Sequence, residues 1–181
     1  PRSRGLGDVY KRQGFAGIAP TIAAINAKKQ VALANTESIL VAGELVTKLA
    51  QERGVNIYPI DSRQSSIFQC IVGEFHNKIE KIYLTAQGGP LQNIDSSQLH
   101  KVTKEELLTH STSFIDEKSR IDSASMMRAG FEAIQAKWLF NLKPNQIEIL
   151  VHKQAIIESI VQFEDGGLKT HMALPDMKLP I

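Results

Sequence analysis

The feature that most constrains the fold of this chain is the alternation of short apolar runs with helical periodicity. Three runs have the length and composition of buried strands: residues 30–35, 56–61 and 81–86. Between the first two, helical spacing over residues 36–53 places Ile39, Val46 and Ala50 on one stripe that ends before Gly54. Strands that alternate with helices in this order imply right-handed crossovers, with ligand loops at the carboxyl ends of the strands. The sequence therefore predicts an α/β fold with three candidate functional loops: residues 35–38, 61–63 and 85–90.

The rest of the chain predicts further helices and an antiparallel hairpin. Thr103 and Glu106 have the spacing of a capping box at the start of a short helix. A longer helix is expected over residues 123–140, where one apolar stripe predicts a core face made of Met127, Phe131, Ile134 and Trp138. The remaining expected elements are a helix that begins near Pro20, a short helix at 66–72, a strand at 147–152, and a hairpin of 159–163 with 168–172.

Composition excludes several classes of function. The 181 residues are 43% hydrophobic and 22% charged, and a net charge of +2 leaves no basic patch for a nucleic acid. Charged residues interrupt the apolar stretches well short of the roughly 20 residues that a membrane span needs. Cys70 is the only cysteine, which excludes an internal disulfide and fits a reducing compartment. We therefore expect a cytoplasmic protein without a nucleic-acid or membrane partner.

The first thirteen residues differ from the rest of the chain. Residues 1–13 are rich in basic side chains and lack apolar periodicity or any cap that a fold would use. They are expected to be a non-native leader, so that the natural sequence would begin near Gly14, inside a domain.

Several segments together carry a resemblance to a known family. They are GFAGIAPTIAAI, VALANTES, YPIDSRQSSIFQC, LTAQGGP, IDSASMM, GFEAIQAKWLFNLKP and QFEDGGLKTHMALPDMKLPI. In this order they resemble 1-deoxy-D-xylulose 5-phosphate reductoisomerase, the NADPH-dependent enzyme of the non-mevalonate isoprenoid pathway. The resemblance implies the end of a Rossmann-like NADPH-binding domain at residues 14–62, followed by an α+β catalytic and dimerisation domain at 63–181. It also implies a homodimer, a small phosphorylated sugar as substrate, and missing family segments on both sides, including the Gly-rich phosphate turn.

The resemblance implies a site for Mg²⁺ or Mn²⁺, because the family holds the ion with carboxylates of a D-S-E loop and of a following helix. Hard oxygen ligands suit these ions. Asp61 and Glu132 stand in two of the ligand positions, whereas Arg63 occupies the third. A guanidinium keeps its positive charge and cannot ligate a cation. Two unit charges about 4 Å apart repel by roughly 4 kcal/mol at an effective dielectric of 20, and a divalent ion would feel more.

Other positions depart from the family pattern in the same region. The pattern has a substrate-contacting lysine at Thr36, a phosphate-loop serine at Gln87, and asparagine and lysine at Arg128 and Ala129. Glu158 stands where a histidine is common. Other site positions match: Asn35 and Glu37 on the cofactor side, and Ser62, His110 and Ser123 around the substrate.

Each of these residues also has a purely structural interpretation. Glu37 fits the first turn of its helix, Ser123 could be a helix N-cap, and His110 could end a turn at the surface. Asp61 with Arg63, or Glu132 with Arg128, could form salt bridges. Two functions remain open at this point. One is a fragment of a reductoisomerase homologue with a degraded site that is not catalytically competent; the other is part of an active NADPH- and metal-dependent enzyme with a remodelled site.

Overall fold

The computed structural model describes residues 14–86, 91, 94–109, 117–152, 154 and 156–173. Within these residues, a 3₁₀ turn at Gly14–Gly17 precedes the α-helices α1 (Ile18–Asn26), α2 (Thr36–Arg53), α3 (Ser62–Ile71), α4 (Lys104–Thr109), α5 (Glu117–Ala124) and α6 (Met127–Leu139). The strands are β1 (Val31–Leu33), β2 (Ile57–Pro59), β3 (Ile79–Ala86), β4 (Ile147–Val151), β5 (Ile157–Phe163) and β6 (Leu168–Met172). The predicted α/β fold class is confirmed.

The strands belong to two separate sheets. Strands β1 and β2 form a parallel pair, joined by α2 as the crossover predicted from sequence. Strand β3 does not continue this sheet, which corrects the expectation of one continuous alternation. It lies inside a four-stranded sheet of order β4-β3-β5-β6, parallel to β4 and antiparallel to β5, and β5 and β6 form the predicted hairpin.

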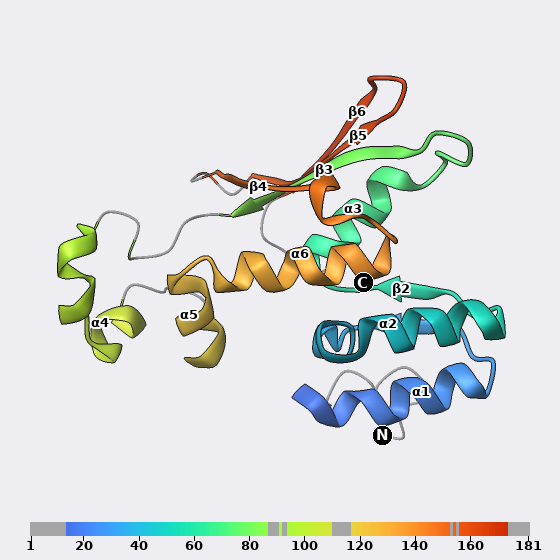
Figure 1. Cartoon of the computed structure of the whole chain (residues 1–181), viewed down its shortest axis with the longest axis horizontal. Coiled ribbons are helices and arrows are strands. Elements are labelled where there is room, and N and C mark those ends of the chain that lie inside the picture. The colour runs from blue at the N-terminus through green and yellow to red at the C-terminus, as the bar shows by residue number, and fades with distance from the viewer. Residues whose placement is uncertain are drawn as a thin grey trace.

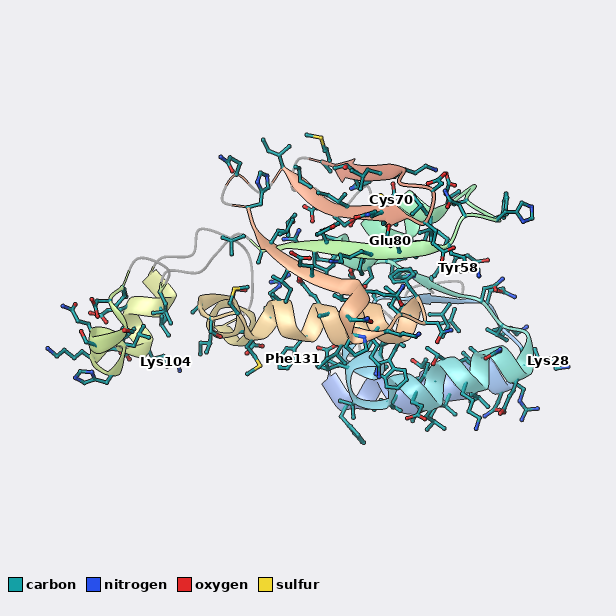
Figure 2. All side chains as sticks on the ribbon, turned by 45° about the horizontal axis from the view of Figure 1, so that its top comes forward. Lys28, Tyr58, Cys70, Glu80, Lys104 and Phe131 are labelled. Atoms are coloured by element: carbon teal, nitrogen blue, oxygen red, sulfur yellow. The ribbon has the colours of Figure 1, made fainter. Side chains whose placement is uncertain are left out.

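Helix α6 lies between the larger sheet and α2, so it contacts both halves of the structure (Figure 1). One apolar core contains Ile67 of α3, Ile82 and Leu84 of β3, and Val161 and Phe163 of β5. The second core lies around α1, β1 and α2, and Trp138 and Leu139 of α6 pack against it. Figure 2 shows that side chains fill the layer between the larger sheet and α6, while α4 lies away from both cores.

Local capping explains where two site-bearing helices begin. Asn35 Oδ1 accepts the N–H of Ser38 at 2.8 Å and begins α2, which ends at Gly54 in the left-handed conformation (φ 65°). Asp61 Oδ1 accepts the N–H of Gln64 at 2.7 Å, so α3 begins at Ser62 rather than at the predicted residue 66. The predicted capping box is also present: the N–H of Thr103 meets Glu106 Oε2 at 2.9 Å, and the N–H of Glu106 meets Thr103 Oγ1 at 3.3 Å.

The long helix expected over residues 123–140 is wrong in two respects. The helix is interrupted between α5 and α6, where Ser125 Oγ accepts the N–H of Met127 at 3.2 Å. Ser123 therefore lies inside α5 instead of at an N-cap. The predicted core stripe is only partly correct, because Met127 and Ile134 are 54% and 42% exposed. The buried face of α6 instead carries small or amide side chains, namely Ala129, Gln135 and Ala136, which allow close approach to the neighbouring elements.

Within the described ranges, none of the helices combines the length and apolar character needed to span a bilayer.

Candidate functional site

A pocket of about 180 Å³ lies where α2 and α3 begin and α6 passes across them. Because β1 and β2 are parallel, the helices that follow them start at the same edge of the sheet. The lining is formed by three segments: Thr36, Glu37 and Leu40 of α2; Asp61, Ser62 and Arg63 at the start of α3; and Asp122, Arg128, Phe131, Glu132 and Gln135 from α5 and α6. Figure 2 labels Phe131 on the α6 ribbon. Two of the three predicted ligand loops therefore meet at one pocket.

Asp61 is held by its capping role. One carboxylate oxygen accepts the Gln64 N–H at 2.7 Å, and the other, Oδ2, is buried without a hydrogen-bond partner. Burial raises the pKa of Asp61 from an ordinary 3.8 to about 6; the Gln64 N–H opposes this shift, and the nearby Glu132 carboxylate adds to it. The charged form of Asp61 is therefore poorly compensated in this structure.

Arg63 reaches across the site from the first turn of α3. Its Nη1 donates to Thr85 Oγ1 at 2.6 Å and to the carbonyl oxygen of Glu158 at 3.0 Å. The same nitrogen lies 3.0 Å from Glu158 Oε2, and Nε lies 3.7 Å from Glu132 Oε2. All three charged side chains are 13–14% exposed. Arg63 therefore joins α3 to α6 and to strands β3 and β5 through a nearly buried charge network.

Arg128 occupies the more exposed rim of the same site. Its Nε lies 3.1 Å from Glu132 Oε1, one helical turn away, and its Nη1 donates to Ser123 Oγ at 3.4 Å. The Arg128 side chain is 43% exposed, so solvent screens this pair far more than the Arg63 contacts. The suggested Arg128–Glu132 salt bridge is thus present, whereas Arg63 meets Glu132 and Glu158.

These residues do not fit a divalent cation in the geometry observed. Each carboxylate oxygen of Glu132 faces a guanidinium group. Oε1 faces the guanidinium of Arg128, and Oε2 faces that of Arg63. Asp61 offers one oxygen that is not committed to the backbone. Among the residues that the structure describes, no group of three or more His, Cys, Asp or Glu side chains could hold a metal ion.

The structure places the other predicted site residues as follows. Asn35 is buried beneath the start of α2, where Nδ2 donates to the Gly14 carbonyl at 3.1 Å, so it lies behind the pocket lining. Ala129 is 5% exposed on the core face of α6 and does not line the pocket. Gln87 and His110 lie outside the described residues.

Sequence reasoning named Glu158 as a departure from the family pattern and Thr85 as the first residue of a candidate loop, but it missed their contacts with Arg63. Both contact Arg63, although they lie 95 and 22 residues away in the chain. A signal for Glu158 was present, because positions 63 and 158 both depart from the family pattern and carry opposite charges. Opposite charges at two positions that both differ from the family pattern indicate a direct ion pair between them.

Helix starts and carboxylates gathered at the carboxyl ends of parallel strands define an α/β protein with a candidate ligand pocket at the strand ends. The family described as the C-terminal domain of 1-deoxy-D-xylulose 5-phosphate reductoisomerase matches residues 57–140, and the family described as 1-deoxy-D-xylulose 5-phosphate reductoisomerase matches residues 9–43. The chain belongs to the 1-deoxy-D-xylulose 5-phosphate reductoisomerase family.

Individual relatives agree with this assignment. The 1-deoxy-D-xylulose 5-phosphate reductoisomerase of Bacteroides thetaiotaomicron is 54% identical, and that of Chloroherpeton thalassium 46% identical, each over 168 residues. Each match covers 93% of this chain and 43% of the relative, so the chain spans less than half the length of these curated relatives.

Solved structures give the same result. The Zymomonas mobilis reductoisomerase in complex with NADPH superposes with a TM-score of 0.84 at 37% identity. A DOX-P reductoisomerase in complex with NADPH, fosmidomycin and magnesium gives 0.83 at 36% identity. Each match covers 94% of this chain and 44% of the solved chain.

Proposed function

We propose that this chain is part of a reductoisomerase homologue of the non-mevalonate isoprenoid pathway whose site does not support the family's metal-dependent reaction. The observation that carries the proposal is the Arg63 guanidinium, which lies 3.0 Å from Glu158 and 3.7 Å from Glu132. A cation bound by Glu132 would have to displace or repel this fixed positive charge. Asp61 and Glu132 are therefore remnants of a metal site rather than a working one.

The other substitutions support the same conclusion. Thr36 lines the pocket where the family pattern has a lysine, so a positive contact to substrate is lost. Arg128 retains a positive charge, but its guanidinium is committed to Glu132 and Ser123. Ala129 is buried and uncharged, so it cannot replace a phosphate-binding lysine. The charged lining of the pocket consists of four carboxyl groups and two guanidinium groups, which disfavours an anionic sugar phosphate.

For the cofactor, two solved relatives are complexes with NADPH, and one of these also contains magnesium. In this chain Glu37 is the cofactor-side residue that lines the pocket, and Asn35 acts by fixing the start of α2. Ser62, Ser123 and His110 are proposed as the substrate-side residues of the ancestral pocket. The division into residues 14–62 and 63–181 and a homodimeric assembly are also proposed on the family resemblance, whereas a leader at 1–13 and a cytoplasmic location are proposed on the composition of the sequence.

The second candidate is an active enzyme with a remodelled site. It is favoured by the pocket itself, since Glu37, Asp61, Ser62 and Glu132 still line one cavity. Under this candidate the cation contacts would be rearranged when substrate binds, with Arg63 leaving Glu132.

A chimera distinguishes the two candidates. Residues 14–181 replace the matching segment of the Bacteroides thetaiotaomicron relative, and NADPH oxidation is followed with 1-deoxy-D-xylulose 5-phosphate and Mn²⁺. We expect no oxidation above background. Reverting five positions together should recover activity: Thr36→Lys, Arg63→Glu, Gln87→Ser, Arg128→Asn and Ala129→Lys. In the chimera that carries the other four reversions, Arg63→Lys is the matched control. It keeps the positive charge at position 63, so this variant should stay inactive. Oxidation by the unreverted chimera at the rate of the relative would establish the remodelled enzyme instead.

A further inference from the structure

We propose that the Arg63 guanidinium is a built-in cation that organises this site in place of a metal ion, and that Glu158 is the counter-charge that holds it there. The inference rests on the proposed function, because guanidinium groups face both Glu132 oxygens that a metal ion would need. It adds a role for Arg63. The arginine removes one metal ligand, and its guanidinium also holds the surrounding elements together.

The Arg63 side chain contacts several elements at once. From α3 it contacts Glu132 of α6, Thr85 of β3, and both the carboxylate and the carbonyl oxygen of Glu158 of β5. Helix α3 is itself fixed on β5, because Ser66 Oγ donates to Ser159 Oγ at 2.7 Å within the buried layer. One side chain thus joins four elements, as a metal ion coordinated by several residues would. A planar guanidinium fork suits such a task better than an ammonium point charge.

Arg63 also compensates the negative charge of two nearly buried carboxylates. Glu132 and Glu158 have side chains only 13% and 14% exposed, and carboxylates this poorly hydrated require a positive partner. Arg63 is 13% exposed and lies between them. A basic residue in the first turn of a helix opposes the helix dipole, so the position is unfavourable for arginine unless tertiary contacts compensate. Glu158 supplies that compensation at 3.0 Å, closer than Glu132.

Arg128 differs from Arg63 in its position and exposure. It pairs with the same Glu132 at 3.1 Å, but it lies on the same helix and is 43% exposed. Its pair therefore joins no separate elements and is screened by water. Arg128 is the matched control for Arg63: it has the same residue type and the same carboxylate partner, but its ion pair lies inside one helix and its contact with α5 is a longer hydrogen bond, 3.4 Å, to Ser123.

A double-mutant cycle on the 181-residue chain tests the pairing. Arg63→Gln, Glu158→Gln and their double variant are compared by urea unfolding with a second cycle of Arg128→Gln and Glu158→Gln. We expect the first cycle to show coupling of about tenfold in the unfolding equilibrium constant and the second cycle to be additive. Additive behaviour in the first cycle would overturn the assignment of Glu158. Should Arg63→Gln fail to fold, Arg63→Lys takes its place, and its loss should likewise be smaller in the Glu158→Gln background; an equal loss there would also overturn the assignment.

Thermal unfolding with MnCl₂ or with EDTA tests whether the Arg63 guanidinium takes the place of a metal ion. The melting temperature of the parent chain should be the same in both, whereas that of Arg63→Glu should rise with Mn²⁺, because that variant places a third carboxylate beside Asp61 and Glu132. If Arg63→Glu folds but its melting temperature does not rise with Mn²⁺, the proposal that the Arg63 guanidinium takes the place of a metal ion is wrong. A rise in the parent chain would instead contradict the proposed function, so the two failures are distinguishable.

Discussion

The contact between α2 and α6 predicts opposite outcomes for the same substitution at two helical glycines. A Cβ at Gly43 would lie 2.4 Å from Cδ1 and 2.9 Å from Cβ of Trp138. These atoms are close to the backbone of α6, so a rotation of the indole cannot relieve the clash and the helices must separate. A Cβ at Gly130 of α6 would meet nothing within 4 Å.

The magnitudes follow from two competing terms. Alanine in place of glycine in a helix interior contributes about 1 kcal/mol through helix propensity. Overpacking a close contact costs typically 1–3 kcal/mol, and a 2.4 Å approach belongs at the upper end of that range. We therefore expect Gly43→Ala to lower the free energy of unfolding by about 1 to 2 kcal/mol, and Gly130→Ala to raise it by about 0.5 to 1 kcal/mol.

Urea unfolding followed by circular dichroism measures both variants under identical conditions. Separation of α2 from α6 would also widen the pocket, since Thr36 and Glu37 come from one helix and Arg128 and Glu132 from the other. If Gly43→Ala stabilises the chain as much as Gly130→Ala does, the close crossing of α2 and α6 is wrong, and with it the geometry of the pocket.

Three further predictions concern charged and reactive groups. Arg63→Met should lower the free energy of unfolding by about 3 kcal/mol, because it removes the ion pair of the nearly buried Glu158 carboxylate, while Glu132 keeps Arg128, whereas Arg128→Met should cost less than about 1 kcal/mol; similar losses in urea unfolding would contradict the difference in burial. Asp61→Asn should stabilise the chain by about 1 to 3 kcal/mol at pH 7.5, because the folded-state pKa of about 6 exceeds the ordinary 3.8 and ionisation therefore opposes folding as the pH rises through this interval. Asparagine caps helices as well as aspartate does, so this gain should shrink from pH 6 to pH 4, and a constant or negative effect would refute it. Burial raises the pKa of the Cys70 thiol, so its alkylation by iodoacetamide should be slow in the native chain and fast in 6 M urea; equal rates would place Cys70 at the surface.

Much of the local structure could be predicted because its causes are local. The stop of α2 at Gly54 and the capping box of Thr103 with Glu106 each depend on residues within one helical turn. The hairpin of β5 and β6 likewise follows from alternation on both sides of a glycine-containing turn. The predicted start of α3 at residue 66 is too late, because Asp61 caps the helix and α3 begins at Ser62.

The larger errors arose where distant segments determine the outcome. Strand β3 pairs with β4 and β5, and nothing in its own sequence distinguishes this from pairing with β2. The stripe of Met127 and Ile134 is apolar, yet the neighbours of α6 lie against its alanine face. The Arg63–Glu158 pair spans 95 residues, so only a fold that brings α3 beside β5 could turn two separate substitutions into one interaction.

Calorimetric titration of MnCl₂ into the 181-residue chain tests the central claim most directly. With the Arg63 guanidinium between Glu132 and Glu158, we expect no heat of binding above that of the buffer. A micromolar site that disappears on Asp61→Asn would contradict the account, because it would show that the family's metal site persists in spite of Arg63.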